Sequence, residues 1–208
     1  MRAFPSLKAA LEEFSDGKAR REIEHTFFGK LENKELLTTA KGMEHQEQWE
    51  IKLEKTEKNA AGGKWRIRKT VVDGQDPEYV LTCKTAGKEE GSIEVGVAVT
   101  EAMFTQFKMM AEQGMIKDRY FFPVEGSELV WEVDMFFKKG SQPGSKDYED
   151  WCKIDLEVPS LEMALPPLPE GFSEMITAPY GKRTEAEELK VRSLFQNEFL
   201  LPNVFLNK

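Results

Sequence analysis

The feature that most constrains this chain is a charged face that recurs, at two-residue spacing, in one predicted strand after another. It appears first over residues 21–28, where Glu22 and Glu24 are two apart. Side chains of a strand alternate between its faces, so both carboxylates point the same way. Such carboxylates repel each other unless a cation lies between them, and Mg²⁺ or Mn²⁺ prefers oxygen ligands. Taken alone, the pair is more typical of an ordinary solvated strand face.

Alternation of apolar and charged residues predicts eight strands. They cover residues 21–28, 46–55, 64–72, 78–85, 92–99, 115–123, 128–136 and 151–158. The second and third form a hairpin on which Arg66 and Arg68 face one way and Trp65 and Ile67 the other. The charged residues that fall in step are the cations Arg66, Arg68, Lys84, Lys117 and Arg119 and the anions Glu22, Glu24, Glu94, Asp134, Asp155 and Glu157.

Helices are expected over residues 5–14, 33–41, 101–113 and 184–199. Thr100 is a good N-cap for the third, which should end near Gly114. Thr184 and Glu187 form a capping box that starts the fourth. The apolar face of the third helix, expected to pack in the core, is Met103, Phe104, Phe107, Met110 and Ala111.

Composition narrows the class of protein. The chain has 208 residues, expected to form one domain over 1–208, and its formal net charge of −8 argues against a nonspecific nucleic-acid binder. Cys83 and Cys152 belong to no Cys-x-x-Cys pair, so no structural zinc site is expected. Without a recognisable signal peptide or membrane-spanning run, we expect a cytoplasmic protein with two free thiols.

The recurring charged face allows two arrangements. In the first, an antiparallel sheet turns its apolar face to the core and its charged face to water, and pattern alone favours this. In the second, the strands roll into a barrel whose interior is charged and whose apolar outer face is covered by helices. A charged interior needs a charged guest, and a polyphosphate with a divalent cation matches a mixture of cations and carboxylates.

The motifs and their order resemble the CYTH domains, also called triphosphate tunnel metalloenzymes. Glu22 and Glu24 match the ExExK strand of that family, and Arg66 and Arg68 match its RxR strand. Further matches, in the order of the family, are Leu81-Thr82-Cys83-Lys84, Lys117-Asp118-Arg119, Val133-Asp134-Met135-Phe136 and the closing pair Asp155 and Glu157. The resemblance covers residues 22–180.

The resemblance implies an α+β, mainly β fold: an eight-stranded antiparallel closed barrel that forms a tunnel, with flanking helices. It implies a substrate with a triphosphate group, and Mg²⁺ or Mn²⁺ as cofactor. The residues implied are Glu22, Glu24, Lys84 and Glu94 for catalysis; Arg66, Arg68, Lys84, Lys117 and Arg119 for the triphosphate; and Glu22, Glu24, Asp134, Asp155 and Glu157 for the metal.

The chain departs from the family pattern at three places. Thr26 stands where ExExK has its lysine, and Ser92 and Gly96 replace the arginine and second glutamate of an RxExE strand. Asp155 replaces the first glutamate of the closing ExE, a milder change because aspartate can still bind a metal. Two lost cations favour weakened, altered or absent turnover.

The resemblance predicts metal-dependent hydrolysis of tripolyphosphate, a nucleoside triphosphate or thiamine triphosphate. Two alternatives stay open: a phosphate- or nucleotide-binding module without turnover, and an adenylate cyclase that makes cyclic AMP. The expected partner is a small molecule carrying a triphosphate; no membrane is expected, and the only nucleic-acid partner considered is an RNA 5′-triphosphate end. Trp49 and Trp65 could stack on an organic group, and packing on the apolar face is the expected role.

Overall fold

The computed structural model describes residues 20–53, 63–85, 92–141, 144–160, 162–173 and 183–202, so the helix predicted over residues 5–14 lies outside them. The strands are β1 (Arg20–Glu22), β2 (Glu24–Leu31), β3 (Gly42–Leu53), β4 (Gly63–Val71), β5 (Glu78–Thr85), β6 (Ser92–Ala98), β7 (Gln113–Pro123), β8 (Val130–Phe137), β9 (Tyr148–Glu157), β10 (Phe172–Ser173) and β11 (Leu201–Pro202). The helices are η1 (Lys34–Thr39, 3₁₀), α2 (Glu101–Met110), α3 (Glu185–Leu194) and η2 (Phe195–Phe199, π). Every predicted strand is confirmed, and the first is divided in two at Ile23.

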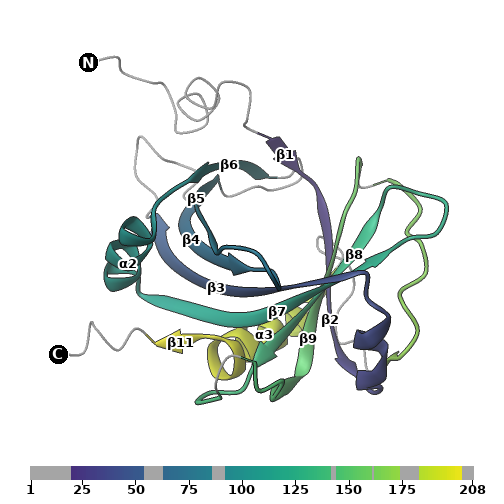
Figure 1. The fold of residues 1–208 in the computed structure, drawn as a ribbon. Helices are drawn as coiled ribbons and strands as arrows, with labels where there is room; N and C mark the ends of the chain where they lie inside the picture. The colour runs from purple at the N-terminus through teal and green to yellow at the C-terminus, as the bar shows by residue number, and fades with distance from the viewer. Residues whose placement is uncertain are drawn as a thin grey trace.

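The strands form one strongly curved antiparallel sheet in the order β1-β6-β5-β4-β3-β7-β8-β9-β2-β10, with β11 beside β7 (Figure 1). β1 pairs with β6, where Glu22 is opposite Ser92, and β2 pairs with β9, where Glu24 is opposite Glu157. Only Ile23 separates β1 from β2, so the chain passes at once from one end of the sheet toward the other. The predicted mainly β, antiparallel fold is confirmed. The predicted closure into a barrel is not, because hydrogen bonds among the described residues do not join the two ends of the sheet.

The main apolar core lies on the outer face of β2, β7, β8 and β9. Val133 and Ile154 belong to it, and they alternate along their strands with charged residues that face the other way. η1 and the segment after β9 cover this face through Leu36, Leu37 and Met163. The predicted alternation is thereby confirmed, with apolar residues outside the curve of the sheet and charged residues inside it.

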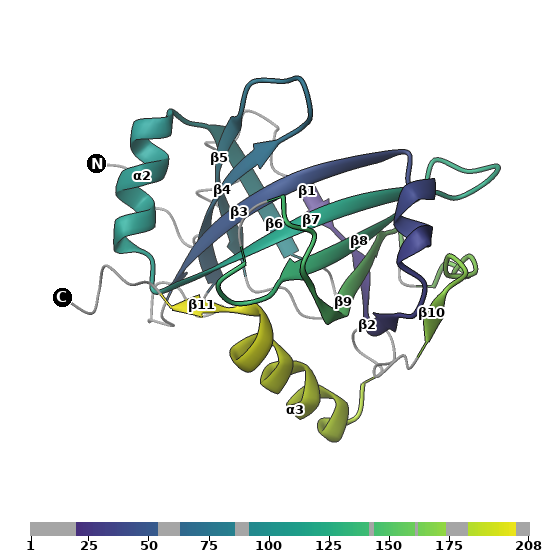
Figure 2. The ribbon, with the colours of Figure 1, turned by 60° about the horizontal axis from the view of Figure 1, so that its bottom comes forward.

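The helices lie at different sides of the sheet (Figure 2). α2 contacts β3, β4 and β5, where Phe104 packs with Trp49 and Ile67. η2 follows α3 and packs Phe199 against Phe136 of β8, with ring centroids 3.9 Å apart. None of the helices formed by the described residues is long and apolar enough to cross a bilayer.

The caps predicted for two helices are confirmed, and one helix end is corrected. Thr100 accepts from the Met103 amide at the start of α2, and Thr184 and Glu187 form the capping box of α3. α2 ends at Met110, and Gly114 lies inside β7 rather than at a helix end. A Cβ atom on Gly114 would lie 2.5 Å from the Trp49 ring, so this glycine permits the close approach of β7 and β3.

The predicted apolar face of α2 is only partly buried. Phe104 and Ala111 are in the core, whereas Met103 and Met110 are 51% and 66% exposed. The reason is that α2 contacts β3, β4 and β5 on one side only, so the residues directed at these strands are enclosed. The expectation that Met103 and Met110 pack in the core is therefore wrong.

Candidate functional site

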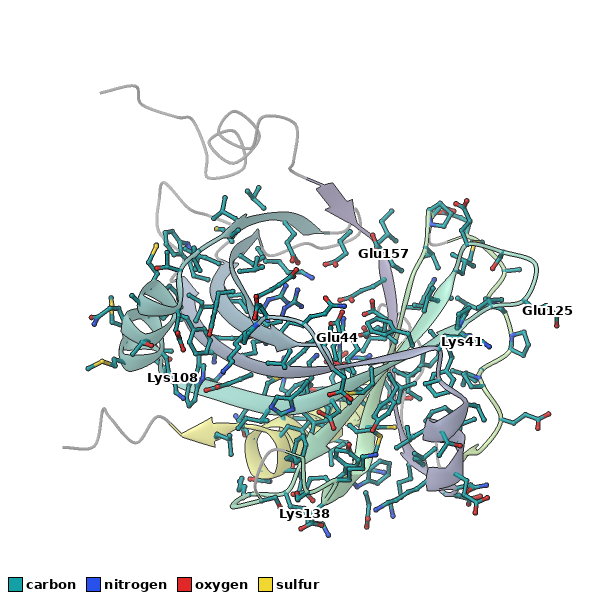
Figure 3. All side chains as sticks on the ribbon, viewed as in Figure 1. Lys41, Glu44, Lys108, Glu125, Lys138 and Glu157 are labelled. Carbon is teal, nitrogen blue, oxygen red and sulfur yellow. The ribbon has the colours of Figure 1, made fainter. Side chains whose placement is uncertain are left out.

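The inner side of the curved sheet holds a cavity of about 330 Å³ that is lined mainly by charged side chains. Every site residue expected from the sequence lines it: Glu22, Glu24, Arg66, Arg68, Lys84, Glu94, Lys117, Arg119, Asp134, Asp155 and Glu157. Figure 3 shows Glu44 and Glu157 among the side chains gathered inside the curve, while Glu125 and Lys138 lie at the periphery. The structure thus brings the expected residues together; the roles implied for each stay predictions.

The burial of this charged face decides between the two arrangements open to the sequence. Lys117, Asp134 and Asp155 are buried, and Arg66 and Lys84 are largely enclosed. The preference of the pattern alone for a water-facing charged face is therefore wrong. Period-two alternation shows which residues share a face, and it does not show which face lies inside a curved sheet.

One side of the cavity, here called the first wall, consists of Glu22, Glu24, Arg66, Lys84 and Glu94 on β1, β2, β4, β5 and β6. Lys84 is opposite Glu94 in the sheet, and its ammonium lies 3.6 Å from the carboxylate of that residue. The same ammonium forms an ion pair with Glu22 and lies 3.8 Å from Glu24. Three carboxylates therefore converge on one lysine.

The charge of Lys84 is stabilised by this convergence. Burial acts to lower the pKa of Lys84, but Glu24 and Glu22 outweigh it, so the pKa is raised. Burial acts to raise the pKa of Glu94, while Arg66 at 2.7 Å and Lys84 lower it overall. Lys84 and Glu94 are therefore both ionised at neutral pH.

The opposite side, here called the second wall, consists of Lys117, Arg119, Asp134, Lys153 and Asp155 on β7, β8 and β9. Arg119 lies directly opposite Asp134 and contacts it through two nitrogens, Nε at 2.7 Å from Oδ1 and Nη2 at 2.9 Å from Oδ2. Lys117 also pairs with Asp134, which is completely buried. Such a bidentate contact fixes the guanidinium in one orientation.

Burial and charge act against each other in the second wall. Burial would raise the pKa of Asp134, yet Arg119 and Lys117 lower it well below its usual range. Burial and the nearby Arg119 lower the pKa of Lys117 to about 7, although Asp134 opposes the shift. Lys117 is therefore the cation of this cavity whose charge is most easily lost near neutral pH.

Asp155 connects the second wall to β2, where its partner is Thr26. Thr26 is opposite Asp155 in the sheet and donates from Oγ1 to Oδ1 at 2.7 Å. Lys153 pairs with the other oxygen of Asp155. Burial acts to lower the pKa of Lys153, but Asp155, Glu24 and Asp134 raise it overall. Thr26, where the family pattern has a lysine, thus supports a carboxylate that already holds a lysine from β9.

Arg68 differs from every other cation of the cavity. Among the described residues, no carboxylate lies within 4.0 Å of its guanidinium, and its buried Nε atom has no hydrogen-bond partner. Burial, followed by the charges of Arg66 and Arg119, lowers the pKa of Arg68. Since Arg66 belongs to the first wall and Arg119 to the second, Arg68 is influenced by cations on both sides of the cavity.

The carboxylates of the cavity, as arranged, do not fit a divalent cation. Within the described ranges, no group of three or more His, Cys, Asp or Glu side chains is placed to hold a metal ion. The residues implied as ligands are divided: Glu22 and Glu24 contact Lys84, and Asp134 and Asp155 contact cations of the second wall. Mg²⁺ or Mn²⁺ would have to compete with these ammonium and guanidinium groups.

Sequence reasoning missed several residues that line the same cavity: Glu44, Gln46, Gln48, Glu50, Lys64, Glu132 and Lys153. A signal for them was present. The four residues of β3 alternate with Trp49 and Ile51, and Lys153 is two residues before Asp155. An apolar group, Met115, Phe136 and Phe195, lines the cavity as well, and Phe195 reaches it from the π-helical turn η2.

The tryptophans considered as stacking surfaces do not line this cavity. Trp49 is buried beneath α2 and donates from Nε1 to Glu47 at 2.8 Å. Trp65 stacks on Phe107 with ring centroids 6.4 Å apart. The expected packing role is confirmed for Trp49, whereas Trp65 packs on Phe107 and stays 39% exposed.

Comparison with known proteins gives structural likenesses only. No protein-family model and no curated protein matches the sequence. A crystal structure of the inorganic triphosphatase NE1496 is similar with a TM-score of 0.42 and 20% identity, over 82% of this chain and 94% of that one. A second structure of NE1496 gives 0.41 and 20%, over 81% and 96%.

The Schizosaccharomyces pombe Mediator head module is similar to nearly the same degree, with a TM-score of 0.39 and 11% identity over 85% of this chain and 96% of that one. Proteins of such different kinds share these scores, so the likenesses do not decide what the chain binds. The chemistry of the cavity has to decide it.

Proposed function

We propose that the cavity binds the triphosphate group of a small molecule and that the protein is a triphosphatase. The observation that carries the proposal is Arg68, a half-buried residue whose guanidinium has a buried Nε atom without a hydrogen-bond partner and no carboxylate within 4.0 Å among the described residues. A buried unpaired charge is costly, and an anionic ligand would remove that cost. Phosphate suits the site because the planar fork of arginine pairs with phosphate oxygens.

The neighbouring cations extend this site to more than one phosphate. Arg66 is two residues from Arg68 on β4, and Arg119 lines the same cavity from β7, so guanidinium groups reach the cavity from both walls. Lys117 lies on the same face of β7 as Arg119. A chain of phosphates would meet cations along its length, whereas a single carboxylate ligand would leave most of them unused. The volume of about 330 Å³ is in the range of small-molecule sites.

Hydrolysis is the reaction that this arrangement supports. Water attack on a terminal phosphoryl group is catalysed chiefly by positioning and by neutralising charge on the phosphate oxygens. Arg66, Arg68 and Arg119 would supply that neutralisation. Glu24, whose side chain is 35% exposed, is the most accessible carboxylate in contact with Lys84 and would orient the water. We include the closed tunnel and the dependence on Mg²⁺ or Mn²⁺ in this proposal, as the resemblance implies.

A second candidate is capture of the triphosphate without turnover. The contacts of Lys84 favour it, because the carboxylates expected to serve catalysis are engaged by an ammonium group. Thr26 favours it as well, since its hydroxyl supports Asp155 and adds no positive charge.

Two measurements on the same samples separate these candidates: binding of a triphosphate compound and release of inorganic phosphate from it. Tripolyphosphate, ATP, GTP and thiamine triphosphate are tested with Mg²⁺, with Mn²⁺ and with a chelator. The variants are Arg68→Met and the double variant Glu22→Gln, Glu24→Gln; Lys69→Met, one residue from Arg68 on the same strand, is the matched control.

Metal-dependent phosphate release that is lost in the double variant supports the triphosphatase. Binding without release supports capture, and cyclic AMP formed from ATP would assign a cyclase instead. Absence of binding by all four compounds would overturn the proposal, as would binding that Arg68→Met leaves unchanged.

A further inference from the structure

We propose that residues 5–14 form a helix that docks on an apolar patch on the outer side of β4, β5, β6 and α2. This docking concerns the side of the sheet opposite the cavity, so it is independent of what the cavity binds. The patch, here called the outer patch, consists of Trp65, Cys83, Val97, Met103, Phe107 and Met110.

The strands supply one half of the outer patch. Side chains of β4, β5 and β6 alternate, so those between the charged residues that line the cavity point outward. Trp65 is opposite Cys83 in the sheet, and Leu81, two residues from Cys83, is opposite Val97. Trp65 and Val97 are exposed, and Cys83 is half-buried. The outer face is therefore apolar across three neighbouring strands and open to a partner.

α2 supplies the other half. Met103, Phe107 and Met110 are four and three residues apart, so they share one side of the helix. Phe107 stacks on Trp65, which joins this side of α2 to the strands. Met103 and Met110 are exposed, and flexible methionine side chains adapt to the shape of an apolar partner. A continuous exposed apolar surface of this kind is typical of a contact site.

The pairing of β1 indicates which partner reaches the outer patch. β1 is antiparallel to β6, with Arg20 opposite Glu94. Because of this direction, the chain arrives at Arg20 from the side of β6 that holds Val97. The segment before β1 is thus tethered next to the outer patch, and a tethered segment has a high effective concentration at a neighbouring site.

The sequence of this segment suits the outer patch. Residues 5–14, which lie outside the described residues, have the pattern of an amphipathic helix with Leu7, Ala10, Leu11 and Phe14 on one stripe. Such a helix is about 15 Å long, and three neighbouring strands span about 10 Å. Residues 15–19 can bridge up to about 17 Å. The helix can therefore lie across β6, β5 and β4, which removes both apolar surfaces from water.

Docking has a consequence for the first wall. β1 has only three residues, and one of them is Glu22, which pairs with Lys84. β2 is fixed on the other side of Ile23 by its pairing with β9. A helix on the outer patch anchors the chain before β1 as well, so it stabilises the position of Glu22.

The test is a cross-link within the full chain between Cys83 and a cysteine introduced into the helix. Leu11→Cys lies on the apolar stripe, and Ala9→Cys, on the opposite side of the same helix, is the matched control. A short bismaleimide should link Leu11→Cys to Cys83 in at least about ten times the yield of the control, because docking brings only one side of the helix to the patch. Cys152 is fully buried and should not react.

Mass spectrometry of a mixture of isotope-labelled and unlabelled chains distinguishes links within one chain from links between two. Equal yields from the two variants would overturn the inference, and so would links formed only between chains, which would assign the outer patch to a second copy. In the unsubstituted protein, the amides of residues 7–14 should exchange hydrogen at least about tenfold more slowly than in the unfolded chain. Exchange at the unfolded rate would overturn the inference without the use of any variant.

Discussion

The two walls of the cavity carry the same kinds of side chain and hold them differently. In the second wall, Asp134 is completely buried and Asp155 is 4% exposed, and each contacts at least two donors. In the first wall, Glu24 is 35% exposed, and three carboxylates share Lys84. In the second wall each acid has its own cations, whereas in the first wall Arg66 pairs with Glu94 and Lys84 is shared by Glu22, Glu24 and Glu94.

This difference indicates that the second wall positions its cations and that the first wall can exchange contacts with a ligand. The buried pairs of the second wall fix Arg119 and Lys117 in place, because breaking a buried pair leaves an uncompensated charge. Glu24 of the first wall is the more accessible carboxylate, and its contact with Lys84 can be exchanged for a ligand at lower cost. Arg68 has no carboxylate within 4.0 Å in the described part of the chain, and burial, Arg66 and Arg119 lower its pKa more than Glu44 and Glu94 raise it, so an anionic ligand would stabilise its charge.

The contrast between the walls is tested most strongly by neutralising one carboxylate of each. Asp134→Asn should lower the free energy of unfolding by about 3–5 kcal/mol, because Arg119 and Lys117 lose a buried counter-charge. Glu24→Gln should change it by less than about 1 kcal/mol, as for exposed ion pairs. Urea unfolding of both variants measures this, and equal losses would show that the walls are equally rigid.

The role of Arg68 predicts opposite effects on binding and stability. Arg68→Met should weaken tripolyphosphate binding by about 2 kcal/mol, the scale of hydrogen bonds to charged groups. It should leave the free energy of unfolding unchanged or raise it, since a half-buried charge without a carboxylate within 4.0 Å in the described residues is removed. Calorimetric titration and thermal unfolding are compared with those of Lys69→Met. A loss of stability in Arg68→Met would mean that Arg68 has a structural partner.

The pH dependence of stability should distinguish Lys117 from Lys84. Burial lowers the folded-state pKa of Lys117 to about 7, below its unfolded value, so between the two values the unfolded state binds more protons. In that window Lys117 makes the free energy of unfolding rise with pH, by at most about 1.4 kcal/mol per unit. Lys84 has the opposite sign: its pKa is raised, so its contribution is present at lower pH and is lost as pH rises through the folded value.

Unfolding of the unsubstituted protein and of Lys117→Met is therefore compared from pH 7 to more alkaline values. The free energy of unfolding should increase with pH relative to the variant. Parallel curves would show that Asp134 keeps Lys117 charged throughout.

The smallest predicted effect concerns the support that Thr26 gives to the second wall. Thr26→Val removes the hydrogen bond to Asp155 while keeping the shape of the side chain, and should cost about 1 kcal/mol of unfolding free energy. Thr26→Ser, which keeps the hydroxyl, serves as the control and should lose less. Denaturant titration measures both, and the same loss in both variants would assign the effect to packing.

Much of the fold and the members of the site could be predicted from sequence, because they depend on local periodicity. The two-residue spacing of Glu22 with Glu24 and of Arg66 with Arg68 identified correctly which residues share a face. The same spacing could not show that the inward face is the charged one. That depends on the curvature of the whole sheet and on the apolar segments that cover its outside.

The features that sequence reasoning missed depend on partners far apart in the chain. Gly114 looked like a helix end, and its actual role follows from the Trp49 ring, 2.5 Å from where a Cβ would lie. Lys153 was in step with Asp155, yet its contact with that carboxylate and the hydrogen bond from Thr26 appear only when β2 and β9 are paired. No local pattern specifies such contacts across strands.

The central claim is that the cavity receives a triphosphate between its two walls, at Arg68. A crystal structure of the protein with tripolyphosphate tests it most directly. The account predicts phosphate oxygens within about 3 Å of the Arg68 guanidinium, with Arg66 or Arg119 on the same ligand. A ligand bound on the outer face beside α2, or a cavity without phosphate at saturating concentration, would contradict it.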